Sequence, residues 1–151
     1  MSDLFKKLNL TDQTEILVID APASVEPEIA ALVGVKVVRQ ASKVRAPRFA
    51  LVFATTLAQV EAAARGIAAR ATGDPILWMA YPKGSSKTYR CEFNRDNGWQ
   101  ALGEVGYEPV RQVAIDADWS ALRFRRVENI QRMTRSFAMT AEGKRKAGKR
   151  P

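Results

Sequence analysis

The sequence predicts an α/β domain with a three-layer, doubly wound, mostly parallel sheet of about six strands and an antiparallel edge strand. Three continuous apolar runs, typical of strands buried on both faces, cover residues 15–20, 49–54 and 76–81. Segments with helical spacing lie between them, and right-handed crossovers favour the strand order 2-1-3-4-5. We expect residues 1–140 to form this single domain and residues 141–151 to be a basic, mobile tail.

Local signals place the elements of the first half of the chain. Ser2 and Asp3 are expected to cap a short helix. Ser24 and Pro27 open a second helix, because proline is favoured in the first helical turn. A short second strand is then expected at residues 35–38, which completes a βαβ unit with the strand at its start.

The second half of the chain has one clear helix and several weaker signals. Apolar residues recur at positions i, i+3, i+4 and i+7 over residues 57–71, which predicts a helix. Asn94 is expected to cap a further helix, and residues 110–115 to form a fifth strand. Residues 120–126 alternate apolar and arginine side chains, which favours a half-exposed strand at the sheet edge. The spacing over residues 130–137 predicts a short packed helix.

The composition excludes several kinds of site. With 46% hydrophobic and 26% charged residues, the 151-residue chain is expected to be globular. It contains no histidine, which excludes histidine triads and zinc sites, and we expect neither a metal nor a cofactor. Cys91 is the only cysteine, and no apolar run approaches the roughly 18 residues that span a bilayer. A cytoplasmic protein without a membrane partner is therefore expected.

Two motifs carry a resemblance to a known family. The first is Leu-Trp-Met-Ala-Tyr-Pro-Lys at residues 77–83, followed by two serines, and the second is Ile-Asp-Ala-Asp-Trp-Ser-Ala-Leu-Arg-Phe-Arg at residues 115–125. Together they resemble a family of small bacterial proteins whose function is uncharacterised, over about residues 4–143. The resemblance implies a bacterial origin and supports the domain boundaries, and it supplies no catalytic residues.

One edge of the predicted sheet is the expected ligand site, because ligands of doubly wound sheets bind beyond the carboxyl ends of the strands. That edge should collect Asp20, Thr55 and Asp116. It should also hold a polar loop with two ammonium groups and two hydroxyls, formed by Lys83, Gly84, Ser85, Ser86 and Lys87. Such a loop can hold a phosphate or carboxylate, although it matches no phosphate-binding motif and is also typical of a surface turn. The sequence therefore predicts binding of a small anionic ligand or a protein partner.

Two other functions stay open at this stage. The net charge of +8 favours weak contact with nucleic acid through the basic C-terminal region. The residues expected to make it are Arg123, Arg125, Arg132, Arg135, Lys144, Arg145 and Lys146. Arginines that alternate with apolar residues also protect edge strands from unwanted pairing. An enzyme acting on a phosphorylated substrate would use Asp20 or Asp116 as acid or base, although an aspartate that ends a strand more often forms a turn.

Overall fold

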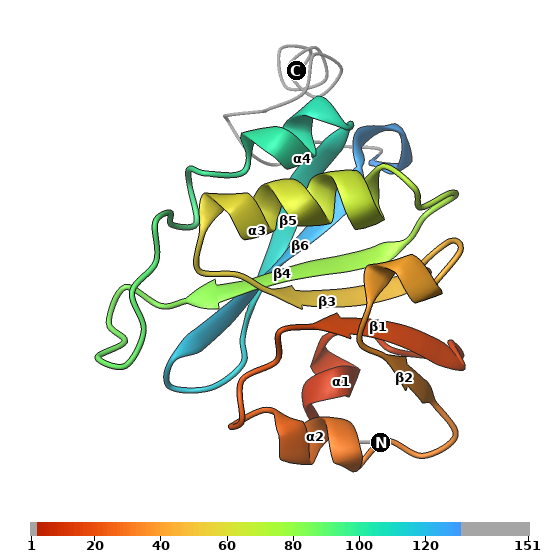
Figure 1. Cartoon of the computed structure of the whole chain (residues 1–151), viewed down its shortest axis with the longest axis horizontal. Helices are drawn as coiled ribbons and strands as arrows, with labels where there is room; N and C mark the ends of the chain where they lie inside the picture. The colour runs from red at the N-terminus through yellow and green to blue at the C-terminus, as the bar shows by residue number, and fades with distance from the viewer. Residues whose placement is uncertain (1–2, 131–151) are drawn as a thin grey trace, which may run out of the picture.

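A six-stranded mixed sheet of order β2-β1-β3-β4-β6-β5 forms the centre of the computed structural model, which describes residues 3–130 (Figure 1). The α/β fold is therefore confirmed. The strands β1, β2, β3 and β4 pair in parallel, whereas β6 is antiparallel to both of its neighbours. The six strands are β1 (Glu15–Ile19), β2 (Lys36–Val38), β3 (Phe49–Phe53), β4 (Ile76–Pro82), β5 (Tyr107–Ala114) and β6 (Trp119–Arg126).

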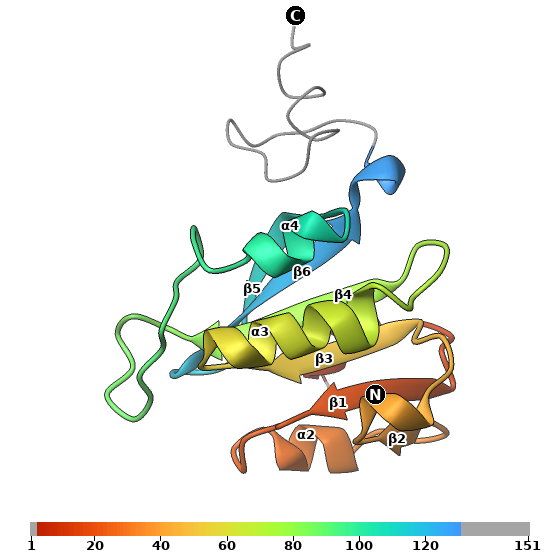
Figure 2. The same cartoon turned by 45° about the horizontal axis from the view of Figure 1, so that its top comes forward.

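Short helices join these strands. They are α1 (Asp3–Lys7), α2 (Glu26–Ala30), α3 (Leu57–Ala63) and α4 (Gln100–Glu104), with single turns at η1 (Ala41–Lys43), η2 (Ala64–Ala68) and η3 (Val127–Asn129). The helix predicted over residues 57–71 consists of α3 and the π turn η2 that continues it. Figures 1 and 2 both show α3 and α4 side by side over the sheet.

Apolar side chains fill both faces of the sheet. Phe49 and Leu51 of β3 pack with residues of α1 and α2, and we call this side the α1 face. Ala50 and Val52 point the opposite way and pack with residues of α3 and α4, on the α3 face. Because successive side chains of a strand alternate, a strand with buried residues at every position must be covered on both sides. This is why the sequence of β3 is one continuous apolar run.

The order of the last two strands differs from the prediction. The order of β2, β1, β3 and β4 is confirmed, but β6 rather than β5 follows β4, so residues 120–126 do not form an edge strand. Leu122 and Phe124 pack on the α3 face, whereas Arg123 faces the other way. Such alternation reports only that one face is buried, and it does not distinguish an edge from an interior position. On this side of the sheet the edge strand is β5, which contains Pro109 and an irregular register beside it.

The helix predicted to start at Asn94 begins later. The side-chain oxygen of Asn94 accepts hydrogen bonds from the backbone N–H groups of Asp96 (2.8 Å) and Asn97 (3.1 Å), which closes a turn, and α4 begins at Gln100. The helix predicted over residues 130–137 and the tail at 141–151 lie outside the described residues, except for Ile130.

A buried hydrogen bond connects β4 to the N-terminal helix. The indole Nε1 of Trp78, in the middle of β4, donates to the backbone carbonyl of Leu8 at 2.8 Å, and Trp78 is fully buried. The indole Nε1 of Trp119 is also buried, but it has no acceptor within the described part of the chain. The two tryptophans therefore offer a matched comparison.

We predict that Trp78→Phe lowers the free energy of unfolding by about 1–2 kcal/mol more than Trp119→Phe, because only the first change leaves a buried carbonyl without its donor. Urea unfolding of both variants measures this difference. Equal losses would show that the Trp78 hydrogen bond does not anchor the N-terminal helix.

Candidate functional site

The carboxyl ends of the parallel strands meet at one edge of the sheet, as predicted. Since β1, β3 and β4 are parallel neighbours, Asp20 and Lys83 follow strands that end on the same side. The strand β5 runs the same way because β6 is antiparallel to both β4 and β5, so Asp116 also lies at this edge. The structure therefore supports the expected location of the strand-end residues.

Asp20 and Thr55 are connected through a glutamine that sequence reasoning missed. The side-chain amide of Gln59 donates to a carboxylate oxygen of Asp20 at 3.3 Å, and its carbonyl oxygen accepts from the backbone N–H of Thr55 at 2.7 Å. Gln59 also forms a capping box with Thr56 at the start of α3. The spacing Thr-x-x-Gln was the available signal. Asp20 adopts a positive φ of 57°, which is unusual for a residue other than glycine.

Asp116 shapes the turn between β5 and β6. One of its carboxylate oxygens accepts from the backbone N–H groups of Asp118 (2.8 Å) and Trp119 (2.9 Å), and the other accepts from the Ser24 hydroxyl at 3.2 Å. These contacts support the interpretation of Asp116 as a turn former rather than an acid or base.

The predicted anion-binding loop is held by its own polar groups. The Ser86 hydroxyl donates to the Asp118 carboxylate at 2.8 Å and accepts from the backbone N–H of Tyr89 at 3.1 Å. The backbone N–H of Lys83 donates to the carbonyl of Asp118 at 2.7 Å. Both motifs of the family resemblance thus lie side by side, because β4 and β6 pair and their end loops are hydrogen-bonded.

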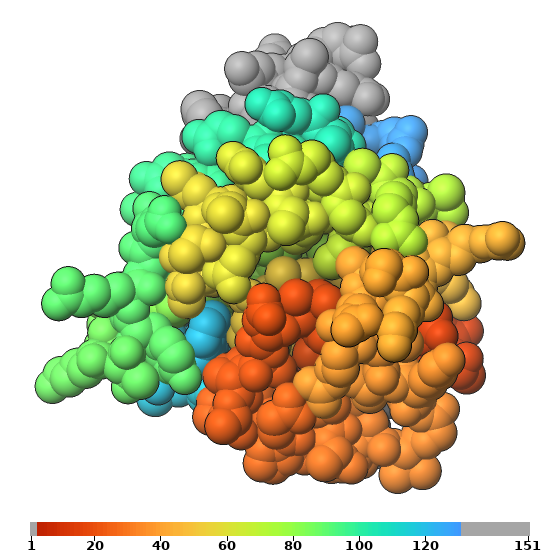
Figure 3. All heavy atoms as spheres, in the orientation of Figure 1, coloured from red at the N-terminus to blue at the C-terminus, as the bar shows by residue number. Residues whose placement is uncertain are grey.

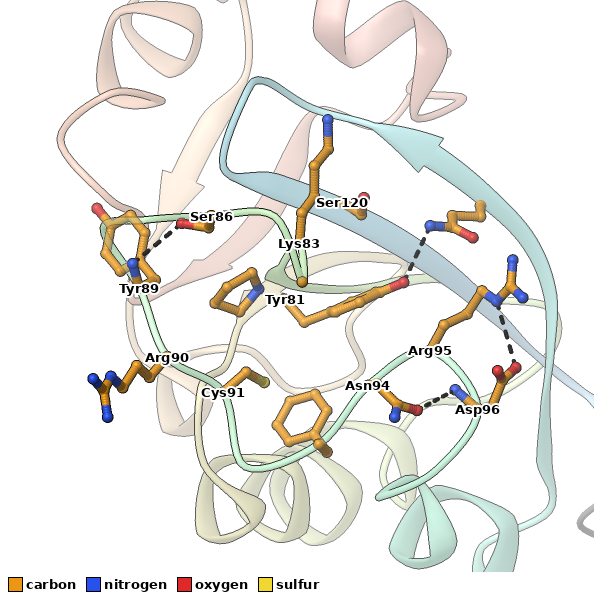
Figure 4. Close-up of a pocket in the computed structure, with 14 residues that line it drawn as sticks. Tyr81, Lys83, Ser86, Tyr89, Arg90, Cys91, Asn94, Arg95, Asp96 and Ser120 are labelled. Carbon is orange, nitrogen blue, oxygen red and sulfur yellow. Dashed lines mark hydrogen bonds and ion pairs between the residues drawn. The ribbon is translucent and has the colours of Figure 1, made fainter.

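A pocket of about 750 Å³ opens beyond the carboxyl end of β4, and we call it the loop pocket (Figure 4). Residues 83–98 form the green segment that projects past the strand ends in Figures 1 and 3. Of the predicted loop residues, Lys83, Gly84 and Ser86 line the pocket, whereas Ser85, Lys87, Asp20, Thr55 and Asp116 do not. The full lining is Tyr81, Pro82, Lys83, Gly84, Ser86, Tyr89, Arg90, Cys91, Phe93, Asn94, Arg95, Asp96, Gln112 and Ser120.

Aromatic packing supports the inner wall of the loop pocket. The ring of Phe93 lies 4.7 Å from that of Trp99, and the ring of Tyr81 lies 5.7 Å from Trp99. The side-chain amide of Gln112 on β5 donates to the Tyr81 hydroxyl at 3.1 Å. Gly98 has a φ of 92° beside Phe93, and a Cβ atom there would lie 2.3 Å from the Phe93 Cβ. Only glycine fits at this position.

The charge of the loop pocket is positive. Lys83, Arg90 and Arg95 line it, with Asp96 as its one lining carboxylate, 3.4 Å from Arg95. Within residues 3–130, Lys83 and Arg90 have no ion-pair partner. Figure 4 shows the three residues on different sides of the pocket, with the side chains of Arg90 and Arg95 pointing away from each other and that of Lys83 pointing away from both. Sequence reasoning missed the two arginines because they lie in a segment without periodic spacing.

Tyr81 and Cys91, which also line the loop pocket, are neutral near pH 7. Burial raises the pKa of the Tyr81 phenol, and burial likewise raises the pKa of the Cys91 thiol. Neither side chain therefore adds negative charge to offset the three cations. A raised thiol pKa also indicates that Cys91 is unreactive.

The predicted nucleic-acid residues are placed only in part. Arg125 forms a bidentate ion pair with Asp74, in which its Nε and Nη2 atoms donate to the two carboxylate oxygens at 2.9 and 2.6 Å. Arg123 lies over the ring of Trp78. Arg132 and Arg135, and with them Lys144, Arg145 and Lys146, lie outside the described residues. The structure therefore assigns a local role to Arg125, as the partner of Asp74.

No family model matches the chain, and no curated protein matches it. The family resemblance and the bacterial origin therefore stay predictions. Among residues 3–130, no helix is long and apolar enough to cross a membrane. The same residues contain no group of three cysteine, aspartate or glutamate side chains placed to hold a metal ion.

We predict that Gly98→Ala lowers the free energy of unfolding by about 2 kcal/mol or more, because the new methyl group collides with Phe93 in a left-handed backbone. Gly66→Ala is the matched control, since nothing lies within 4 Å of a Cβ atom there. It should be neutral or slightly stabilising. Thermal unfolding of both variants measures the effect, and equal stability of the two would contradict the packing of residues 93–98.

A pH dependence is predicted for the Asp74–Arg125 pair. The hydrogen bond from Arg125 lowers the pKa of Asp74 below its ordinary value of 3.8, so the pair contributes stability above that value and loses it as the pH falls. Wild type should therefore exceed Asp74→Asn in stability at neutral pH, and the difference should disappear in acid. Urea unfolding over a pH series tests this, and a constant difference at all pH values would refute it.

Proposed function

We propose that this protein binds a small anionic ligand in the loop pocket at the carboxyl end of β4. The observation that carries the proposal is the imbalance of charge, with three cationic side chains and one carboxylate around a pocket of about 750 Å³. This volume lies within the roughly 300–1,000 Å³ typical of small-molecule sites. Lysine and arginine bind phosphate and carboxylate groups through charge-assisted hydrogen bonds.

The lining favours a ligand with an apolar body and an acidic group. Tyr81 and Phe93 give the pocket an aromatic wall, and Asn94 offers an amide beside it. The cations lie around the rim, where their field attracts an anion and their long side chains can close on it. A phosphorylated or carboxylated metabolite with a ring fits this arrangement best.

Binding is supported better than acid or base catalysis. Asp116 is committed to the β5–β6 turn, and Asp20 is held by Gln59 and lies outside the pocket lining. Tyr81 and Cys91 have raised pKa values, so neither is ionised near neutral pH. We keep the predicted cytoplasmic location as part of this proposal; it rests on the single Cys91 and on the lack of a long apolar run in the sequence.

A thermal-shift screen with nucleotides, phosphorylated sugars and aromatic carboxylates tests the proposal, because a ligand that binds only the folded state must raise Tm. The double variant Lys83→Ala with Arg90→Ala should weaken a ligand found in this way by about tenfold or more. The free energy of unfolding should change by no more than about 0.5 kcal/mol, since both side chains lie at the surface. Calorimetric titration gives the affinities.

The matched control is Lys43→Ala with Arg45→Ala, which removes the same charge from exposed residues outside the loop pocket. It should leave the affinity nearly unchanged. The proposal would be contradicted if no anion raised Tm in the screen, or if the two double variants lost affinity equally.

A further inference from the structure

Arg123 occupies a position that the fold does not explain. An arginine that alternates with apolar residues protects an edge strand, but β6 has partners on both sides. Its neighbours on the strand have clear roles. Arg125 pairs with Asp74, and Arg126 donates to the carbonyl of Ala71 and lies over the Tyr107 ring. Arg123 needs a different explanation.

No described residue accepts a hydrogen bond from Arg123. Its guanidinium carbon lies 6.0 Å from the centre of the fully buried Trp78 ring, and its Nε atom is buried without an acceptor. A buried donor that lacks an acceptor destabilises the folded chain. Burial also lowers the pKa of this guanidinium, because a charged group is less stable away from water.

A second arginine lies next to the first. Arg111 of β5 is directly opposite Arg123 in the register, so their Cβ atoms are roughly 5 Å apart, and like charges in that arrangement repel. Arg111 is exposed and makes one long contact, of 3.4 Å, with the side chain of Asn9. Of the carboxylates near this pair, Asp74 is already paired with Arg125, and Glu108 is buried directly opposite Arg125 in the register.

We propose that Arg123 and Arg111 form a second binding site, for a phosphate group, on the α1 face of the sheet. A phosphate between the two guanidinium groups would give the outer N–H groups of Arg123 an acceptor and relieve the repulsion, because the arginine fork matches the oxygen spacing of a phosphate. Trp78 of β4 is directly opposite Arg123 on the other side of β6, and its ring lies beneath the Arg123 guanidinium. The phosphate belongs either to a free anion or to the backbone of a nucleic acid.

This site is independent of the proposed function. Tyr81, which lines the loop pocket, packs on the α3 face, whereas Arg123 stacks on Trp78 of the α1 face. Variants of Lys83 and Arg90 should therefore leave the second site intact, and variants of Arg111 should leave the loop pocket intact.

The test uses the full chain and two probes, inorganic phosphate and a single-stranded oligonucleotide. The buried Nε–H of Arg123 gives an NMR signal that should shift on titration with at least one probe. Arg111→Gln should weaken binding of that probe about tenfold. For the oligonucleotide, it should also reduce the slope of log K against log salt by about 0.7. Arg45→Gln, at an exposed position elsewhere, is the control and should change neither value by much.

The outcomes separate the two phosphate sources. Binding of both probes through Arg111 and Arg123 indicates a site for free phosphate groups, and binding of the oligonucleotide alone indicates a nucleic-acid backbone; both support the site. Because Arg123→Gln could impair folding, the exposed Arg111→Gln variant provides the decisive comparison. The proposal is overturned if neither probe shifts the Arg123 signal, or if Arg111→Gln and Arg45→Gln lose affinity equally.

Discussion

The strand β6 pairs antiparallel with β4 on one side and β5 on the other, and the position of the candidate site depends on this pairing. Because β6 enters the sheet from the edge at which β4 and β5 end, the β5–β6 turn lies beside the loop after β4. The contacts of Asp118 with Lys83 and Ser86 follow from that juxtaposition. They hold the start of residues 83–98 against the sheet, so that the rest of the segment can curve outward and enclose the loop pocket.

Much of the fold could be predicted, because buried strands leave a strong pattern. The apolar runs at β1, β3 and β4 located three central strands, and the crossover rule ordered them together with β2. The place of β6 could not be predicted in the same way. Leu122 and Phe124 pack on one face, and Arg123 and Arg125 on the other, so the alternation describes the faces of the strand and not its neighbours.

The candidate site was predictable only to the level of the sheet edge. The position of Lys83 could be predicted, because it follows a parallel strand and such strands end at the same edge of the sheet. Arg90 and Arg95 could not be predicted, because they lie in a segment without regular spacing. Asn94 shows why a local pattern is not enough to predict this segment. Its side chain suits both a helix cap and a turn; it closes a turn here, and α4 begins only at Gln100, after Gly98 has adopted a positive φ beside Phe93. Such contacts depend on tertiary packing, which no local pattern encodes.

The positive charge of this chain indicates a binding site only after each lysine and arginine has been checked for an ion-pair or hydrogen-bond partner. Of the 24 lysine and arginine residues in the chain, seven lie within residues 131–151, with Glu142 as the one acidic residue there, so the rest of the chain is close to neutral. Within that part, Arg39 forms an ion pair with Glu26, and Arg125 forms one with Asp74, so these two arginines already have local partners. Cations without an ion-pair partner are informative where they gather, as Lys83 and Arg90 do at the loop pocket, or where one lies beside a buried ring, as Arg123 does. A net charge spread evenly over the surface would favour non-specific contact with polyanions, whereas unpaired cations gathered around a pocket or beside a buried ring favour defined anion sites.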